Sequence, residues 1–268
     1  MSRLLAVTLG NTTASVSLTD AGLAPPAPSA VEGSAVEGLG EVLRVPIGRL
    51  ENLKEALPGE GADLSEEGVC VVVASVNPRA LARLRGIAVD VTGAEPDVAG
   101  ADFPIPIRAE VDVPESVGVD RLLAALAAHR RAKGACIVVD AGTAVTVDAV
   151  SADGAFQGGA IFPGLEMIAR ALAEGAALLP KVDLPSEAPR VGKNTREAIA
   201  AGLVHGVTGA VAALVEGARE TVGREAAVFL TGGDAALLAP HLPAVLREVV
   251  PNLVLEGLVI AYREWRKR

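Results

Sequence analysis

The sequence predicts an α/β protein built from two related halves. Valine-rich apolar runs alternate with Ala- and Leu-rich segments that have helical spacing, which is typical of folds in which helices pack on a sheet. One stretch near the start of the chain is also repeated near its middle. Half of the 268 residues are hydrophobic, so the chain can bury a substantial core.

The repeat is the observation that indicates duplication. The stretch LLAVTLGNTTASVSLTDAG begins at Leu4, and CIVVDAGTAVTVDAVSADG begins at Cys136. The offset of 132 residues places Thr8 opposite Asp140. Each copy contains an apolar run, a turn with glycine and a second run that alternates between polar and apolar residues. This pattern predicts a β-hairpin at the start of each half.

The other elements follow from apolar periodicity and from Gly and Pro positions. Beyond the hairpins, the predicted strands are residues 68–76, 87–91 and 226–230, with residues 103–111 alternating towards the junction of the halves. The predicted helices are residues 47–57, 79–86, 120–133, 164–177, 195–219 and 251–268. Residues 21–40 and 178–194 are predicted to be loops.

Composition argues against two classes of partner. The chain has 33 acidic and 24 basic residues, a net charge of −9, and only 2% aromatic residues. Nucleic-acid grooves are basic and often aromatic, and membrane surfaces attract basic patches, so we expect neither partner. No apolar run approaches the roughly 18 residues that a membrane helix needs. Cys70 and Cys136 lie in apolar runs and are expected to be small buried residues in a cytoplasmic protein.

Three turns could bind phosphate. Residues 9–13 (LGNTT), 140–144 (DAGTA) and 231–235 (TGGDA) each follow an apolar run and combine glycine with hydroxyl, amide or carboxylate side chains. Backbone N–H groups exposed by glycine and neighbouring hydroxyls can cradle phosphate oxygens. Residues 191–195 (VGKNT) lack the first glycine and the Ser/Thr that a Walker A loop needs. The three turns together favour a nucleotide phosphate site.

The segment GKNTRE, residues 192–197, has two interpretations. Asn194 and Glu197 have the spacing of a capping box, which predicts a helix start. The same segment could instead contact a substrate. The sequence leaves both interpretations open.

Several motifs in order resemble type III pantothenate kinases: LGNTT, ASVNP, PESVGVDRLLAALAA, DAGTAVTVDAV, GAFQGGAIFPGL, LLP, GKNTREAIAAGLVHG and TGG. The resemblance implies two duplicated ribonuclease-H-like domains around an interdomain nucleotide cleft, as in the actin, Hsp70 and sugar-kinase superfamily. The domains would be residues 1–115 and 116–268, each with one phosphate loop. The implied reaction is ATP-dependent phosphorylation of pantothenate to 4'-phosphopantothenate, the first step of coenzyme A biosynthesis. The resemblance further implies Mg²⁺ with ATP, a monovalent cation (K⁺ or NH₄⁺) and a homodimer.

The resemblance also assigns roles to single residues. Asp120 would accept the proton of the attacking hydroxyl, Arg121 would hold pantothenate, and Asp140 would coordinate the monovalent cation. The ATP-binding residues would be Thr8, Leu9, Gly10, Asn11, Thr12, Thr13 and Thr143. The substrate-binding residues would be Val111, Gly118, Val119, Asp120, Arg121 and Thr195.

Two positions differ from the family pattern. Thr8 stands where active members carry Asp, and Val111 stands where a Tyr is expected. A neutral hydroxyl attracts Mg²⁺ less than a carboxylate does, although Asp20 or Asp148 could take over that role. Asp148 lies on an alternating run and is expected to face solvent. Two alternatives therefore stay open: a catalytically silent nucleotide- or partner-binding relative with a regulatory role, and a kinase for another small hydroxy acid.

Overall fold

The chain folds into two compact units. The computed structural model describes residues 3–20, 39–53, 69–183, 188–246 and 248–268. The first unit comprises Met1–Arg108, Val113–Arg131 and Asn252–Arg268. The second unit comprises Ala109–Asp112 and Ala132–Pro251.

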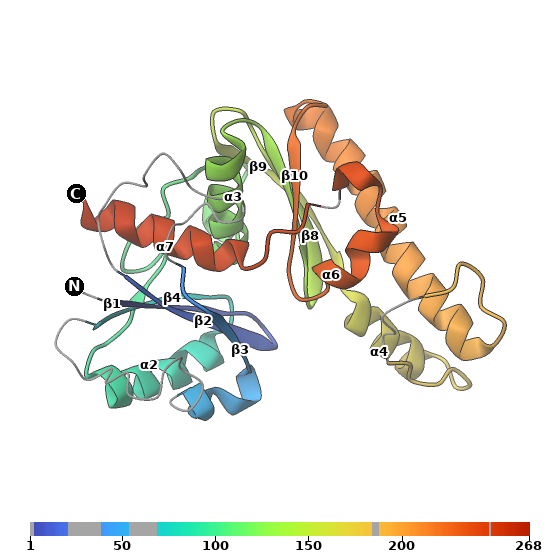
Figure 1. The fold of residues 1–268 in the computed structure, drawn as a ribbon, viewed down its shortest axis with the longest axis horizontal. Helices are drawn as coiled ribbons and strands as arrows, with labels where there is room; N and C mark the ends of the chain where they lie inside the picture. The colour runs from blue at the N-terminus through green and yellow to red at the C-terminus, as the bar shows by residue number, and fades with distance from the viewer. Residues whose placement is uncertain (1–2, 21–38, 54–68, 184–187, 247) are drawn as a thin grey trace. The chain divides into compact units, whose positions relative to one another are not determined.

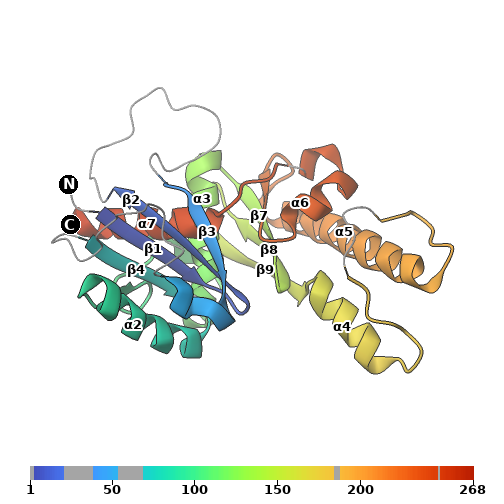
Figure 2. The same cartoon turned by 60° about the horizontal axis from the view of Figure 1, so that its bottom comes forward.

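A five-stranded mixed sheet forms the centre of the first unit (Figures 1 and 2). Its strands, in the order β3-β2-β1-β4-β5, are β3 (Val42–Pro46), β2 (Thr13–Asp20), β1 (Arg3–Leu9), β4 (Val69–Ser75) and β5 (Asp97–Val98). β1 runs antiparallel to β2 and parallel to β4. Because side chains alternate along β1, Leu5 and Val7 enter one apolar cluster while Leu4 and Ala6 enter another.

Helices cover both faces of this sheet (Figure 1). α2 (Pro78–Thr92) and the 3₁₀ helix η1 (Ile47–Asn52) pack on the face that Leu5 and Val7 share. α3 (Val119–Ala132) and α7 (Leu253–Arg266) pack on the opposite face. The predicted domain boundary after residue 115 assigns α3 and α7 to the other domain. Their apolar side chains nevertheless pack with those of β1 and β4, so the first unit recruits both helices.

Four of the five strands in the second unit repeat the strand arrangement of the first, and the fifth lies at the opposite edge of the sheet. Its sheet has the order β10-β7-β8-β9-β6, with β10 (Ala227–Thr231), β7 (Cys136–Ala141), β8 (Ala144–Val150), β9 (Ala155–Pro163) and β6 (Arg108–Ala109). β7 runs antiparallel to β8 and parallel to β10, as β1 does with β2 and β4. The predicted duplication is therefore confirmed. Leu9 pairs with Ala14 but Ala141 pairs with Val145, so the second hairpin turn is one residue shorter.

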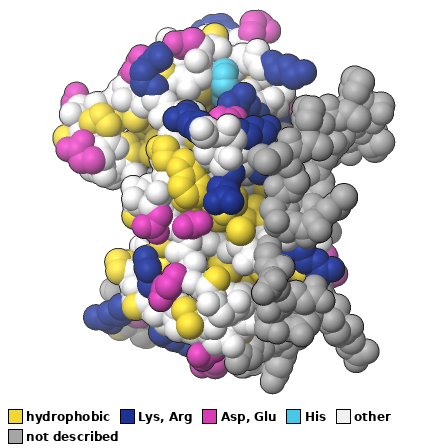
Figure 3. Space-filling view, turned by 90° about the vertical axis from the view of Figure 1, so that its left-hand side faces the viewer, with side chains coloured by type: hydrophobic (Ala, Val, Ile, Leu, Met, Phe, Trp, Pro, Cys, Tyr) yellow, Lys and Arg dark blue, Asp and Glu magenta, His cyan; other side chains and the backbone are white. Residues whose placement is uncertain are grey.

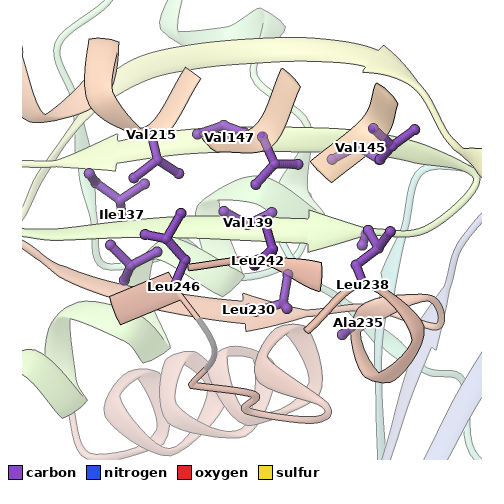
Figure 4. Close-up of a cluster of buried hydrophobic side chains, with 14 of the residues drawn as sticks. Ile137, Val139, Val145, Val147, Val215, Leu230, Ala235, Leu238, Leu242 and Leu246 are labelled. Carbon is purple, nitrogen blue, oxygen red and sulfur yellow. The ribbon is translucent and has the colours of Figure 1, made fainter. Parts of the chain in front are cut away.

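A large hydrophobic cluster of the second unit lies on one face of its sheet. α4 (Leu165–Gly175), α5 (Thr195–Val222), α6 (Ala235–Leu238), η3 (Ala239–His241) and η4 (Ala244–Leu246) supply its other wall. Figure 4 shows three side chains of the sheet, Val139, Val147 and Leu230, in one cluster with Val215 of α5 and Leu242. Cys136 is fully buried, as expected, and burial raises the pKa of its thiol to about 12.

α5 is apolar because it is a core helix. Within the described residues, it is the one helix that is long and apolar enough to cross a membrane, and half of its apolar window is buried. Leu203, Val207 and Val211 pack into the core. The expectation that no run approaches membrane length is therefore wrong for α5, and its burial against the sheet explains the composition.

The structure differs from the predicted elements at residues 87–91, in β9 and at residues 47–53. Residues 87–91, predicted as a strand, form the end of α2. The Asn77 side chain caps α2 by accepting from Ala80 N–H, and Ala80, Leu84 and Ala88 form one buried face, so helical packing overrides β-branched propensity. β9 was not predicted, because its glycines obscure the strand pattern. The helix predicted at residues 47–57 begins as η1, and residues 21–38 and 54–57 lie outside the described part of the chain.

Charged side chains of both signs share the face of the molecule in Figure 3. Basic side chains stand among acidic ones, with hydrophobic side chains between them. Screening acts over about 8 Å at physiological ionic strength, so interspersed charges of this kind produce short-range fields.

A buried ion pair joins α3 to α7. Arg131 Nη2 donates to both carboxylate oxygens of Glu256, at 2.7 and 2.8 Å. The Glu256 side chain is 3% exposed and that of Arg131 is 13% exposed. Removing one partner would leave the other charge buried without it, which is the expensive case for an ion pair.

We predict that Glu256→Ala lowers the free energy of unfolding by about 3–5 kcal/mol. The matched control is Glu264→Ala, which breaks the exposed pair between Arg130 and Glu264 and should cost at most about 1 kcal/mol. Urea unfolding followed by the fluorescence of Trp265, which stacks on Phe103 in the first unit, measures both. Equal losses for the two variants would contradict the prediction.

Candidate functional site

The first glycine turn lies at the tip of the β1–β2 hairpin. Gly10 N–H donates to the Thr13 carbonyl at 3.0 Å, and Ile47 N–H donates to the Thr12 carbonyl at 2.9 Å. These bonds fix the backbone of the turn. The side chains of Asn11, Thr12 and Thr13 are exposed. Exposed amide and hydroxyl groups beside a glycine are suited to phosphate oxygens, and phosphate binding at this turn stays a prediction.

Thr8 and Asp140 occupy equivalent positions in the two sheets. Thr8 is the second-last residue of β1 and pairs with Ala74 of β4. Asp140 is the second-last residue of β7 and pairs with Thr231 of β10. Both side chains are half-buried. The first sheet thus has a neutral hydroxyl where the second has a carboxylate, as the repeat indicates.

The second glycine turn, between β7 and β8, is held from two sides. Gly164 N–H donates to the Thr143 carbonyl at 3.1 Å, and Asp234 N–H donates to the Ala141 carbonyl at 2.9 Å. A Cβ atom on Gly164 would lie 2.1 Å from the Gly142 carbonyl oxygen, so this approach requires glycine. The start of α4 and the start of α6 therefore both pack against the turn.

Two further carboxyl groups belong to the second unit's site. Burial, and then the nearby Glu166 carboxylate, raise the pKa of Asp234 above its usual range. The sequence singled out Asp234 only within the glycine-rich turn at residues 231–235. It missed Glu166, because an acidic residue in the first turn of a helix ordinarily complements the helix dipole. Two carboxyl groups besides that of Asp140 therefore lie near the second turn.

Asp120 is the second residue of α3, which packs on one face of the first sheet. Its Oδ1 accepts from Arg121 N–H at 2.9 Å. A Cβ atom on Gly118 would lie 2.5 Å from Asp120 Oδ1 and 3.9 Å from Val76 Cγ1. Val76 follows β4, and its N–H donates to the Leu9 carbonyl at 3.2 Å. The Asp120 carboxylate therefore lies near the same strand ends as the first glycine turn.

The predicted site residues divide between the two units. The first unit contains the turn residues 8–13 and Gly118, Val119, Asp120 and Arg121. The second contains Val111, Asp140, Thr143 and Thr195. Val111 lies against the backbone of β9, where its Cγ1 is 3.5 Å from the place of a Cβ on Gly158.

An apolar groove of about 550 Å³ borders α4 and α5, which run side by side (Figure 2). Thr195, the first residue of α5, is one of the residues that line the groove. The other lining residues include Phe162, Ile168, Leu172, Ile199 and Leu203. The groove is therefore suited to an apolar surface.

The capping interpretation of GKNTRE is confirmed. Asn194 Oδ1 accepts from Glu197 N–H at 3.0 Å, and Glu197 Oε2 accepts from Lys193 N–H at 2.8 Å. Asn194 Nδ2 also donates to Glu197 Oε1 at 2.8 Å. The segment starts α5, and Thr195 occupies its first turn.

The expectation that Asp148 faces solvent is wrong. Its side chain is 1% exposed, and Thr146 Oγ1 donates to its Oδ2 at 3.1 Å. A Cβ atom on Gly159 would lie 2.5 Å from Asp148 Oδ1, so the neighbouring strand closes over the carboxylate. The side chain of Asp20 lies outside the described part of the chain.

The donors at the second turn fit a hard cation. Within the described ranges, no group of three or more His, Cys, Asp or Glu side chains could hold a metal ion. A single carboxylate such as Asp140 would share a cation with phosphate oxygens and water, which is how Mg²⁺ usually binds. Oxygen donors of this kind suit K⁺ or Mg²⁺ better than a transition metal.

Comparisons with known proteins found a family model, relatives and solved structures that match this chain. A family model described as type III pantothenate kinase matches residues 4–217. A type III pantothenate kinase of Dehalococcoides mccartyi is 38% identical over 193 residues, which cover 72% of this chain and 74% of the relative. One of Rhizorhabdus wittichii is 36% identical over 214 residues, covering 78% and 81%. The solved activator of the 2-hydroxyisocaproyl-CoA dehydratase from Clostridium difficile, with bound ADPNP, has a TM-score of 0.54 at 14% identity, covering 99% of this chain and 96% of that one, which shows the fold alone.

We predict that Asn194→Ala lowers the free energy of unfolding by about 1 kcal/mol, because the first N–H groups of α5 lose their side-chain acceptor. Asn194→Ser, which keeps a capping oxygen, should retain most of that stability. Thermal and urea unfolding monitored by circular dichroism compare the variants. An unchanged stability of Asn194→Ala would show that the cap contributes nothing.

Proposed function

Since this chain belongs to the type III pantothenate kinase family, we propose which of its residues carry out that family's reaction. The protein phosphorylates pantothenate with ATP to give 4'-phosphopantothenate, the first step of coenzyme A biosynthesis. The observation that carries this function is the family match across residues 4–217, which includes both hairpin turns and the start of α3. ATP turnover with pantothenate, measured with Mg²⁺ and with or without K⁺ or NH₄⁺, tests it.

The reaction uses ATP with a divalent metal. When bound to ATP, Mg²⁺ neutralises phosphate charge. Phosphoryl transfer otherwise depends on positioning, so the protein has to hold the phosphates and direct the substrate hydroxyl at them.

Asp120 is the proposed general base. A carboxylate within hydrogen-bond reach of the substrate hydroxyl can take its proton as the new P–O bond forms. Its position at the start of α3, near the ends of β1 and β4, supports this role. The adjacent Arg121 is proposed to bind the pantothenate carboxylate through charge-assisted hydrogen bonds. Gly118 and Val119, which directly precede both residues at the start of α3, are proposed to bind substrate as well.

The two glycine turns are proposed to bind ATP. Their backbone N–H groups and hydroxyls would contact phosphate oxygens. The exposure of the first turn's polar side chains supports this role. The proposed ATP-binding residues are Thr8, Leu9, Gly10, Asn11, Thr12, Thr13 and Thr143.

Asp140 is proposed to hold the monovalent cation, K⁺ or NH₄⁺. Its carboxylate at the end of β7, with the Asp234 and Glu166 carboxyl groups nearby, supports a cation at this place. The cation would offset charge on both the protein and the bound phosphates.

The residues proposed to bind the substrate also include Val111 and Thr195.

The protein is proposed to be a cytoplasmic homodimer. The apolar groove beside α4 and α5 supports dimerisation, because a second copy would remove apolar surface from water. Leu172 on its wall is 36% exposed. Sedimentation equilibrium tests the assembly state.

Thr8 supports a second candidate function. A neutral residue at the end of β1 leaves the first turn without the carboxylate that its counterpart Asp140 provides. The protein would then bind nucleotide with little or no turnover and act through a partner. The Thr8 variant below separates the two candidates.

We predict that Asp120→Asn lowers kcat by about 100-fold or more, because the amide cannot accept the hydroxyl proton. The affinity for ATP should stay close to that of the wild type. Steady-state kinetics and nucleotide binding measure both, with Glu115→Gln in the preceding connection as the charge-matched control. An unchanged kcat would show that Asp120 serves only as a helix-terminal charge.

We predict that Thr8→Asp tightens Mg²⁺-ATP binding by about 10- to 150-fold, corresponding to one added charge-assisted contact of about 1.5–3 kcal/mol. Turnover should rise with it. Thr8→Asn, similar in shape but neutral, is the control and should gain nothing. If Thr8→Asp neither binds Mg²⁺-ATP more tightly nor turns over faster, the missing-carboxylate explanation is wrong.

A further inference from the structure

Gly232 lies where β10 leaves the second sheet. Its φ of +97° lies in the left-handed region that favours glycine. The two residues before it, Leu230 and Thr231, pair with Val139 and Asp140 of β7, and Figure 4 shows Leu230 close to Val139. Gly232 therefore leaves the sheet beside the carboxylate at the end of β7.

No side chain fits at this position. A Cβ atom on Gly232 would lie 2.3 Å from the Ala141 carbonyl oxygen and 2.5 Å from Asp140 Oδ1. Both distances are below the 3.0 Å limit that real Cβ atoms respect. The next residue, Gly233, has nothing within 4 Å of such an atom. The close approach is therefore specific to Gly232.

The same turn is also bonded to β7. Asp234 N–H donates to the Ala141 carbonyl at 2.9 Å, which draws the β10–α6 connection towards the strand end. In the first sheet, Thr8 pairs with Ala74, and the next residue is Ser75, which has a side chain. The sheet that carries the carboxylate is thus the sheet that carries glycine at this position.

We propose that Gly232 is a positioning residue, whose turn closes against the Asp140 carboxylate and holds it in the orientation that binds the monovalent cation. The proposal rests on the cation role given to Asp140 under the proposed function. A carboxylate already confined by its neighbours loses less conformational freedom when it binds an ion. A side chain at residue 232 would displace either the carboxylate or the turn.

The test compares Gly232→Ala with Gly223→Ala. Gly223 has a φ of +102° and open space around a Cβ atom, so its substitution reproduces the backbone strain without the contact. Calorimetry measures Mg²⁺-ATP affinity in KCl and in choline chloride of equal ionic strength. K⁺ should raise the Mg²⁺-ATP affinity of the wild type, and we expect Gly232→Ala to reduce this gain by about 10- to 100-fold. A loss of that size is usual when a residue supporting a metal ligand is changed. Gly223→Ala should keep the wild-type K⁺ dependence.

A double-variant cycle with Asp140→Ala supplies a readout that needs neither ATP nor K⁺. Gly232→Ala should lower Tm by more than the roughly 2–4 °C that about 1 kcal/mol of backbone strain causes in a protein of this size. In the Asp140→Ala background the loss should be smaller, because one clashing atom is gone. Gly232→Ala should also add nothing to the K⁺-binding defect of Asp140→Ala.

Two results would overturn the proposal: wild-type K⁺ dependence in Gly232→Ala, or the same fall in Tm in both backgrounds, which would indicate a purely structural contact with Ala141. If Gly232→Ala does not fold, the double variant replaces it; a folded double variant supports the proposal and an unfolded one overturns it. If Asp140→Ala keeps full K⁺ dependence, the cation role of Asp140 fails, and the Tm comparison still reports separately on the contact.

Discussion

The site depends on one constraint, the parallel pairing of the first strand of each hairpin with a later strand of the same sheet. β1 pairs with β4, and β7 pairs with β10, so each glycine turn lies beside the end of a second strand. Carboxyl ends of parallel strands meet at one edge of a sheet, which is where α/β proteins bind ligands. The bond from Val76 N–H to Leu9 and that from Asp234 N–H to Ala141 both fix this edge.

The two halves use this shared design differently. The residue after β3 is Ile47 and the residue after β9 is Gly164, and each donates its N–H to a carbonyl in the hairpin turn. Only the second position has no room for a side chain, because Gly164 packs directly on the turn. Together with Gly232, this makes the second turn the more closely enclosed of the two. The half with the tighter backbone is also the half that keeps its carboxylate, Asp140.

The first unit depends on a helix from the far end of the chain. α7 returns to pack beside α3 on the first sheet, and the ion pair between Arg131 and Glu256 joins the two helices. Asp120 stands at the other end of α3. Docking of α7 therefore supports the helix that carries the proposed base.

The sequence by itself determined the strands with continuous apolar runs, the duplicated hairpins and the starts of helices α3 and α5. It also determined that Thr8 and Asp140 occupy equivalent positions in the two repeats. These features depend on local periodicity and on spacing within one segment. The tertiary structure decided the rest. Residues 87–91 are helical because the cap and packing of α2 override propensity, Asp148 is buried because β9 closes over it, and α3 and α7 join the first sheet because their apolar faces fit there. The roles of Gly164 and Gly232 depend on contacts between distant segments, which no local pattern in the sequence encodes.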